Sequence, residues 1–256
     1  MMRRKNVFIM MLIVLLGFNF SSRAAAPDSL MVKANAAYNQ QQYDSAVNLY
    51  QKVLQLGVES PGVYYNLGNA YFRLKEIPSA ILYYEKAKKL SPNDPDIQYN
   101  LNMANSMIVD KIDKVPELFI QRWWNYFYNL FDADTWAVLS LVFFALLVLM
   151  IGIFIRAESR RMRKTAFFTG LLLLLLTLGS FGLASQRSYY TKNHTEAIVF
   201  TPAVTVKSSP SINSVDLFVV HEGTKIKVLD EVDNWVKIKI QNGSIGWLPQ
   251  SSVKKI

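Results

Sequence analysis

Two long uncharged apolar segments, separated by a short basic one, constrain the fold of this chain more than any other feature. Residues 136–155 and 165–185 contain no charged side chain, and each is long enough to cross the hydrocarbon core of a bilayer as a helix. Helices are the expected form, because lipid offers no hydrogen-bond partner to an open backbone. The alternative is a pair of buried helices in a large soluble domain, but the leucine run 171–176 has no polar face to present to water. The sequence therefore predicts a transmembrane helical hairpin.

The connecting segment 156–164 predicts how this hairpin is oriented. It carries one acidic and five basic residues, and basic residues in short loops stay on the cytoplasmic side. The topology-determining residues are Arg156, Arg160, Arg161, Arg163 and Lys164. With this loop in the cytoplasm, the segments on both sides of the hairpin share the opposite compartment. We therefore expect a membrane protein with both flanking domains on the side away from the cytoplasm, which for a bacterial inner membrane is the periplasm.

The formal net charge of +9 raises the question of nucleic-acid binding. Four positive charges lie near the amino end, and the hairpin loop adds a net four, so the remaining segments are close to neutral. A nucleic-acid-binding protein would instead show a basic patch on a domain face, and we predict no nucleic-acid partner. The chain has no cysteine, which excludes disulfides, thiolate nucleophiles and cysteine-ligated metal sites.

The amino end, residues 1–26, has the features of a secretory signal peptide. A basic start, Arg3-Arg4-Lys5, precedes the apolar segment 7–18, and small residues follow at 24–26. Cleavage after Ala24 and cleavage after Ala26 both stay open, and an uncleaved amino-terminal anchor is the alternative. Under each interpretation the next domain is exported, in agreement with the orientation expected for the hairpin.

An internal repeat with a period of 34 residues follows. The second copy carries a set of small and aromatic residues: Tyr64, Leu67, Gly68, Tyr71, Ala80, Tyr84, Ala87 and Pro92. This pattern resembles the tetratricopeptide (TPR) repeat, a pair of antiparallel helices, with Tyr64 where that pattern has tryptophan. The first copy departs further, with Lys33 at a leucine position and Val58 at a proline position. We predict two repeats and a capping helix within residues 27–115.

The TPR resemblance implies a concave groove lined by the first helix of each repeat. The positions that would face it are Met31, Asn35, Tyr38, Tyr65, Asn69, Phe72, Arg73, Tyr99 and Met103. Asn35 and Asn69 share one repeat position, and an asparagine can bond both edges of an extended peptide. Only Arg73 in this set is basic, which argues against a clamp for a carboxy-terminal carboxylate. The alternative is that the tyrosines only pack.

Residues 116–135 and the start of the first apolar segment are unusually aromatic. The aromatic residues are Phe119, Trp123, Trp124, Tyr126, Phe127, Tyr128, Phe131 and Trp136. Tryptophan and tyrosine concentrate at the membrane–water interface, so we predict an interfacial helix in contact with membrane lipid. An extra helix packed on the TPR core is the alternative.

After residue 195 the hydrophobic pattern becomes alternating, as in short antiparallel strands. Asn242-Gly243 is a preferred two-residue hairpin turn. Segments 206–210, 221–224, 234–238 and 246–249 resemble, in their order, the bacterial SH3 domain, and Gly-Trp-Leu-Pro is the most specific of them. The resemblance implies a small all-β barrel that binds cell-wall peptides or serves in assembly. Candidate groove residues are Phe218, Trp235 and Trp247, with Trp247 the tryptophan expected in the core.

No segment of the sequence predicts catalysis or a cofactor. The two histidines, His194 and His221, lie apart in the sequence, and no HExxH, Walker, Gly-x-Ser-x-Gly or dinucleotide motif occurs. Metal sites need clustered ligands, and the sequence shows no such cluster. We therefore predict a protein that is not an enzyme and has neither a metal nor a cofactor.

Taken together, the sequence predicts a multidomain chain: an all-α TPR solenoid, a transmembrane α-hairpin and a small all-β SH3-like barrel. The predicted order is signal peptide (1–26), repeats with cap (27–115), interfacial helix (116–135), membrane helices (136–155 and 165–185) around a basic loop (156–164), linker (186–195) and SH3-like domain (196–256). This order resembles the BatE-type proteins of the Bacteroides aerotolerance operon. The resemblance implies a scaffold in a membrane complex with von Willebrand factor A-type Bat proteins. A peptidoglycan tether or sensor is the alternative function.

Overall fold

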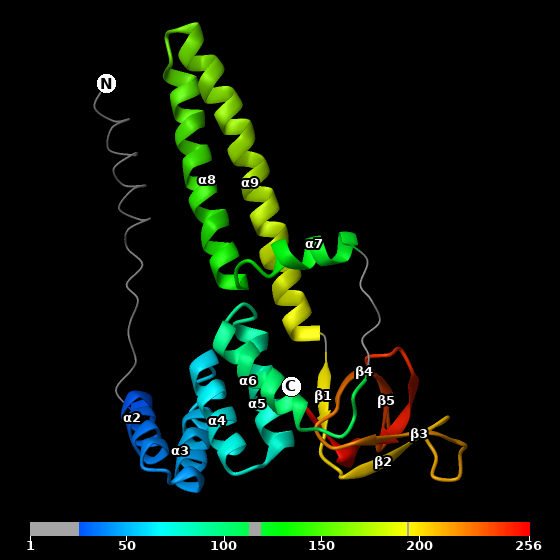
Figure 1. Cartoon of the computed structure of the whole chain (residues 1–256). Helices are drawn as coiled ribbons and strands as arrows, with labels where there is room; N and C mark the ends of the chain where they lie inside the picture. The colour runs from blue at the N-terminus through cyan, green and yellow to red at the C-terminus, as the bar shows by residue number, and fades with distance from the viewer. Residues whose placement is uncertain (1–25, 113–118, 194) are drawn as a thin grey trace.

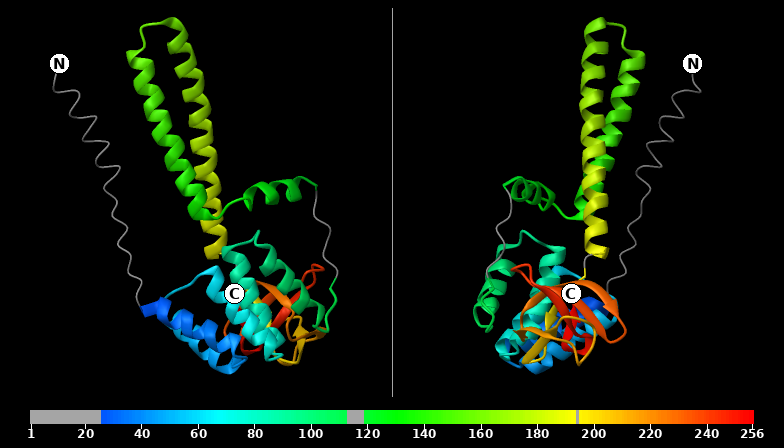
Figure 2. Two further views of the ribbon diagram at one scale, coloured as in Figure 1. Left: turned by 60° about the vertical axis from the view of Figure 1, so that its left-hand side comes forward. Right: turned by 90° about the vertical axis from the view of Figure 1, so that its right-hand side faces the viewer.

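A computed structural model gives the structure of residues 26–112, 119–193 and 195–256. The predicted signal peptide lies outside these residues except for Ala26. Helical repeats and a β-sheet domain lie side by side at one end of a long two-helix hairpin, as the views in Figures 1 and 2 show. The predicted fold class is confirmed: a TPR-like helical array, two long apolar helices and an antiparallel sheet.

Five helices build the repeat domain: α2 (Ala26–Asn39), α3 (Tyr43–Gln55), α4 (Pro61–Arg73), α5 (Ile77–Leu90) and α6 (Pro95–Ser106). Local sequence explains where several of them begin. The Ser60 hydroxyl accepts a hydrogen bond from the Val63 N–H, and the Asp94 carboxylate caps α6 in the same way. A proline occupies the first turn of α4, α5 and α6, where a missing N–H costs nothing.

The repeats pack through the small and aromatic residues that the 34-residue pattern predicts. Tyr50 and Tyr84 are both 1% exposed, and each fills the space between its own repeat and the next first helix. Gly68 lies against the Tyr84 ring so closely that a Cβ at this position would be 2.7 Å from a ring carbon. The glycine therefore sets the distance between α4 and α5.

The apolar segments form helices α8 (Ala133–Arg156) and α9 (Arg160–Asn193), which pack along each other (Figure 1). The Ser140 hydroxyl donates to the Thr177 carbonyl at 3.3 Å, a polar contact between the two helices. In the described part of the chain these are the two helices long and apolar enough to cross a membrane. Only 6% and 22% of their most apolar windows are buried, which agrees better with lipid-facing helices than with the core of a soluble domain.

The connection between α8 and α9 is shorter than the predicted loop 156–164. Arg156 ends α8 and α9 begins at Arg160, so four of the five basic residues lie in the first turns of a helix. Arginine, lysine and methionine favour helices, so a helix can continue beyond its apolar segment. At its other end α9 extends across most of the predicted linker 186–195.

Helix α7 (Phe119–Tyr128) carries much of the aromatic segment and projects sideways from the base of the hairpin (Figure 1). Phe119, Trp123 and Tyr126 are 75%, 60% and 66% exposed. The alternative of a helix packed on the TPR core therefore does not describe α7. The turn after α7 contacts both the repeats and the hairpin. Asn129 in this turn accepts hydrogen bonds from Asn93 of the repeats and from Arg187 of α9.

The carboxyl-terminal domain is one antiparallel sheet with strand order β3-β2-β6-β5-β4-β1-β7. Its strands are β1 (Glu196–Val199), β2 (Ala203–Lys207), β3 (Asp216–His221), β4 (Lys225–Val232), β5 (Trp235–Lys239), β6 (Ile245–Pro249) and β7 (Val253–Lys255), with a 3-10 turn, η1, at Gln250–Ser252. Residues 241–243 form a three-residue turn between β5 and β6, one residue longer than the predicted Asn242-Gly243 turn, and Gly243 supplies the positive φ of +95°. Alternate residues such as Val236 and Ile238 are fully buried and form the core of this domain.

Candidate functional site

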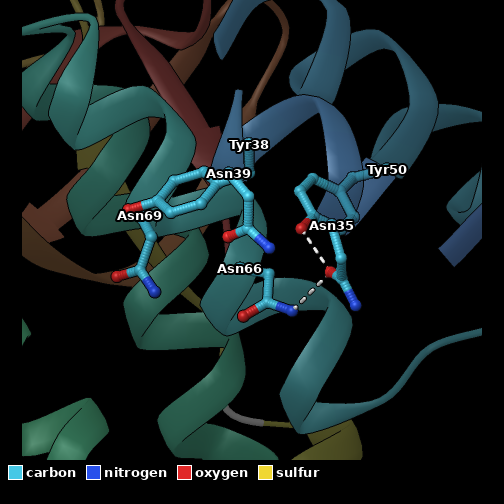
Figure 3. A pocket seen from close by; sticks show the side chains of 6 residues that line it. All are labelled: Asn35, Tyr38, Asn39, Tyr50, Asn66 and Asn69. Carbon is cyan, nitrogen blue, oxygen red and sulfur yellow. Dashed lines mark hydrogen bonds between the residues drawn. The ribbon is translucent and has the colours of Figure 1, made fainter. Parts of the chain in front are cut away.

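The first helices of the repeats surround a pocket of about 310 Å³ on the face that the TPR resemblance assigns to a ligand. The pocket is lined by Asn35, Tyr38, Asn39, Tyr50, Asn66 and Asn69 (Figure 3). We call this surface the asparagine groove. All six side chains are uncharged and polar, so the groove offers hydrogen bonds rather than an apolar surface or a strong field.

A hydrogen-bonded triad holds the first side of the asparagine groove. The Tyr50 hydroxyl donates to the Asn35 Oδ1 atom at 2.6 Å, and the Asn66 amide donates to the same oxygen at 3.3 Å (Figure 3). Tyr50 comes from the second helix of the first repeat and Asn66 from the first helix of the next. The triad therefore joins three helices at one oxygen atom.

The same triad recurs one repeat later. The Tyr84 hydroxyl donates to the Asn69 Oδ1 atom at 2.7 Å, and the Asn100 amide donates to that oxygen at 2.9 Å. Asn100 also donates to the Tyr65 hydroxyl at 2.9 Å. Each member lies 34 residues after its counterpart in the first triad. Both repeats therefore have the same hydrogen-bonded contact between helices, in addition to their apolar packing.

The triads determine which edge of each asparagine faces a ligand. The side-chain oxygens of Asn35 and Asn69 already accept two hydrogen bonds each. Within the described residues their amide nitrogens donate to no protein group, so these remain the groups able to bind a ligand. The groove therefore presents hydrogen-bond donors, which match the carbonyl oxygens of an extended backbone. Bonding by both edges, as the sequence alone allows, would require the triads to open.

Burial of the tyrosines reinforces the neutral character of this site. Burial, together with the neighbouring Tyr38, raises the pKa of Tyr50 to about 12, although the hydrogen bond with Asn66 opposes this. Burial and the adjacent Tyr65 raise the pKa of Tyr84 as well. Both hydroxyls therefore stay protonated at physiological pH and act as donors to the asparagines.

Arg73 is the predicted basic residue of the groove, and it is exposed at the end of α4. Hydrogen bonding to Tyr38 raises the pKa of the Arg73 guanidinium, and Tyr43 contributes in the same direction. The guanidinium thus lies beside Tyr38, at the edge of the asparagine groove rather than among the residues that line it. A single peripheral cation agrees with the argument against a carboxylate clamp.

The other predicted groove residues have different surroundings. Met31 packs against the core of the first repeat, and Tyr65 and Phe72 pack against that of the second. Tyr99 and Met103 on α6 are 65% and 40% exposed and do not line the pocket. Of the nine predicted positions, the structure brings Asn35, Tyr38 and Asn69 together.

Sequence reasoning missed three residues of the pocket and one of its supports. Asn39 and Asn66 line the groove, Tyr50 enters it from a second helix, and Asn100 completes the second triad. A signal for two of them was present, because Asn66 and Asn100 are 34 residues apart like Asn35 and Asn69. Tyr50 carries the same signal, because it lies 34 residues before Tyr84 of the repeat pattern.

The SH3-domain residues divide between two faces of the sheet. Trp235 and Trp247 are half-buried on the outer face of β5 and β6, where Lys237 lies 5.8 Å from the centre of the Trp247 ring. Phe218 pairs with the buried Val206 and packs against the inner core. The expectation that Trp247 belongs to the core is wrong, because its neighbours Gly246 and Leu248 point inward instead.

The ionisable groups of the described residues show no arrangement typical of a metal centre. Within this part of the chain no three histidine or carboxylate side chains lie close enough together to hold a metal ion. His221 is bound to Asp110, with its Nδ1 atom 2.7 Å from the carboxylate. His194 lies outside the described residues.

Comparisons with known proteins identify the two folded parts of the chain. Residues 31–95 match the sequence profile of the tetratricopeptide repeat, and residues 202–254 match that of the bacterial SH3 domain. No curated protein sequence matches the chain.

Solved structures include distant similarities to TPR proteins. The Sgt2 TPR domain from Aspergillus fumigatus is 14% identical over 68% of this chain and 86% of its own, with a TM-score of 0.31. The first TPR of Spaghetti (RPAP3) bound to an HSP90 peptide is 19% identical over 36% of this chain and 100% of its own, with a TM-score of 0.23. The family assignments rest on the two sequence profiles: the chain joins a tetratricopeptide-repeat array to a bacterial SH3 domain, and both are typically non-catalytic interaction modules.

Proposed function

We propose that this protein is a non-catalytic, membrane-anchored adaptor whose asparagine groove binds an extended segment of a partner protein. The observation that carries the proposal is the pair of Asn35 and Asn69 amides near Tyr38, which donate to no group among the described residues and are held by equivalent triads. Two donors that are held alike in successive repeats suit the carbonyl oxygens of an extended backbone, which also repeat along its length. The TPR and SH3 domains themselves indicate protein partners.

The two apolar helices are compatible with membrane anchoring. Both folded domains lie at the end of the hairpin away from the basic residues 156–164 (Figure 2). With those residues in the cytoplasm, groove and barrel would meet the periplasm of a bacterial inner-membrane protein. From the order of the modules we further propose that the partner is a von Willebrand factor A-type Bat protein of a stress-tolerance complex.

A charge placed in the groove tests the adaptor proposal. Asn39 lines the pocket and is exposed, and its side chain makes no hydrogen bond within the described residues. The variant Asn39→Lys therefore places a long, charged side chain in the groove without breaking a triad. Asn48, exposed on α3 and outside the pocket lining, gives the matched control Asn48→Lys. We expect affinity purification with mass spectrometry from native membranes to lose the partner with the first variant and retain it with the second. Equal recovery of the partner with both variants would contradict the proposal.

A peptidoglycan tether or sensor is the second candidate function. It is favoured by Trp235 and Trp247 on the outer face of the sheet, with Lys237 near the Trp247 ring. Retention of the solubilised full chain on purified peptidoglycan tests it, with Trp235→Ala and Trp247→Ala as variants. Loss of retention in the tryptophan variants, but not in Asn39→Lys, would favour the tether. Absence of retention above a control protein would exclude it.

A further inference from the structure

The SH3 domain and the repeats share a hydrophobic core. Ile198 of β1 is fully buried in the same cluster as Tyr84 of α5 and Leu101 and Ala104 of α6. Phe200 and Ile256 of the barrel extend this cluster. The last helix of a repeat array exposes an apolar face that the next repeat would cover, and terminal repeats need a cap for this reason. Here the barrel covers that face: β1 contacts α5, and Figure 1 shows the repeats and the sheet domain side by side.

The segment that follows α6 binds the barrel through Asp110. One carboxylate oxygen accepts hydrogen bonds from the His221 backbone N–H at 2.8 Å and the Thr224 hydroxyl at 2.7 Å. The other lies 2.7 Å from the His221 Nδ1 atom. Thr224 is only 2% exposed. Three hydrogen bonds to one carboxylate, from both ends of one turn, fix the orientation of the barrel on the array.

The same turn is shaped to receive a side chain from the repeat domain. Gly223 has φ +83°, a conformation that residues with a Cβ rarely adopt. A Cβ at this position would also lie 2.4 Å from the Ile108 Cγ2 atom. Ile108 therefore packs directly on the glycine, two residues before Asp110.

A buried ion pair makes the second polar contact between the domains. The Lys225 ammonium lies 2.9 Å from Glu85 of α5 and 2.7 Å from Glu196 of β1. Glu85 is only 7% exposed, so the Lys225 ammonium replaces contacts with water that burial removes. The Lys89 ammonium also donates to the Ile256 carbonyl at 3.2 Å. Apolar, hydrogen-bonded and ionic contacts thus combine at a single interface.

We propose that the SH3 domain of this chain is the carboxyl-terminal cap of the TPR array and that its docking holds α6, with Asn100, in place at the asparagine groove. The reason is that α6 has two functional faces. Leu101 and Ala104 face the barrel-covered core, while Asn100 donates to Asn69 of the groove and to the neighbouring Tyr65. Release of the barrel would expose the first face and free α6 to move. Docking of the barrel and occupancy of the groove are then coupled.

Hydrogen exchange of the full chain in lipid nanodiscs tests this cap. Two separate variants, Asp110→Asn and Ile108→Ala, weaken the interface. Asp216→Asn is the matched control, because Asp216 pairs with Lys207 of the same domain and not with the repeats. We expect α6 amides to exchange about tenfold faster or more in the two interface variants, with α3 and β5 unchanged. The control should exchange as the wild type does.

Unchanged protection of α6 in both interface variants would overturn the proposal. If Asp110→Asn accelerates amide exchange equally in every helix and strand, the variant has unfolded as a whole. The exchange of α6 in Ile108→Ala, which removes only aliphatic atoms, then decides whether the cap exists. The role of the cap at the groove rests on the proposed adaptor function. The exchange measurement uses the protein without a partner, so it tests the cap by itself. Asn39→Lys should leave α6 exchange unchanged even where it abolishes partner recovery, so failure of the adaptor and failure of the cap give different results.

Discussion

At the residue scale, small side chains and hydroxyls decide how close the helices of this array lie. Gly68 allows α4 to approach the Tyr84 ring, and that approach brings the Tyr84 hydroxyl to Asn69. The polar triad therefore depends on an apolar contact. A side chain at Gly68 would disturb both.

Gly68→Ala tests this dependence against a matched glycine on the same helix. An added Cβ would lie 2.7 Å from the Tyr84 ring, whereas nothing lies within 4 Å of a Cβ at Gly62. Overpacking costs about 1–3 kcal/mol, while a helical glycine replaced by alanine without strain gains about 0.5–1 kcal/mol. We expect Gly68→Ala to lower the thermal midpoint and Gly62→Ala to leave it unchanged or raise it. A thermal midpoint of Gly68→Ala equal to that of the wild type would show that the Tyr84 ring moves aside without loss of stability.

At the element scale, the short segment after α6 has more effect on the architecture than its length indicates. Residues 107–112 form no helix or strand, yet Ile108 and Asp110 hold the barrel to the repeats. Burial alone would raise the pKa of Asp110. The hydrogen bonds from the His221 N–H, the Thr224 hydroxyl and the His221 ring outweigh that effect, and its pKa is lowered.

The lowered pKa of Asp110 predicts how docking depends on pH. A carboxyl group whose pKa is lower in the folded state stabilises it above the unfolded value of 3.8, and this contribution disappears as the pH falls through the folded value. His221 is the ionisable group in direct contact with Asp110. Further along the interface, Glu85 and Glu196 each pair with Lys225. We expect α6 exchange to accelerate from about pH 5 to about pH 3 in the wild type after correction for intrinsic rates. The Asp110→Asn variant should show less of this dependence, and an identical dependence in both proteins would argue against the assignment.

At the scale of the whole molecule, the hairpin separates the basic residues 156–164 from the two domains that fold around hydrophobic cores (Figure 2). Aromatic residues gather at the opposite end, where α7 leaves its tryptophans exposed. Trp123 and Trp124 at this level suit the membrane–water interface. A bilayer around the hairpin would then lie close above the repeats and the barrel.

Single cysteines test this orientation, because the chain has none of its own. Ser159→Cys lies in the connection between α8 and α9, and Ser251→Cys is exposed in η1 of the barrel. We expect a membrane-impermeant maleimide added to spheroplasts to label the second variant at once and the first only after lysis. The opposite labelling would reverse the proposed compartments. Labelling of both before lysis would exclude a membrane-spanning hairpin.

The sequence alone determined the modules, because their signals are local and periodic. Uncharged segments of fixed length predict the hairpin, the 34-residue period predicts the helix pairs, and alternation with Asn242-Gly243 predicts the barrel strands. Ends of helices were less well predicted, as α9 shows, because basic side chains continue a helix as readily as leucine does. The groove was predicted in part: its asparagines follow from the period, but their hydrogen-bond partners do not.

Only the tertiary structure decided what the modules do to one another. The pairing of Asp110 with Thr224 joins residues that are 114 positions apart, and neither segment carries a repeat or motif that indicates the other. The burial of Ile198 among residues of α6 is likewise invisible in sequence, since an apolar residue in a strand predicts a core but not which core. Contacts between domains depend on surface shape and on hydrogen bonds in three dimensions. The periodicities that reveal helices and strands carry no information about either.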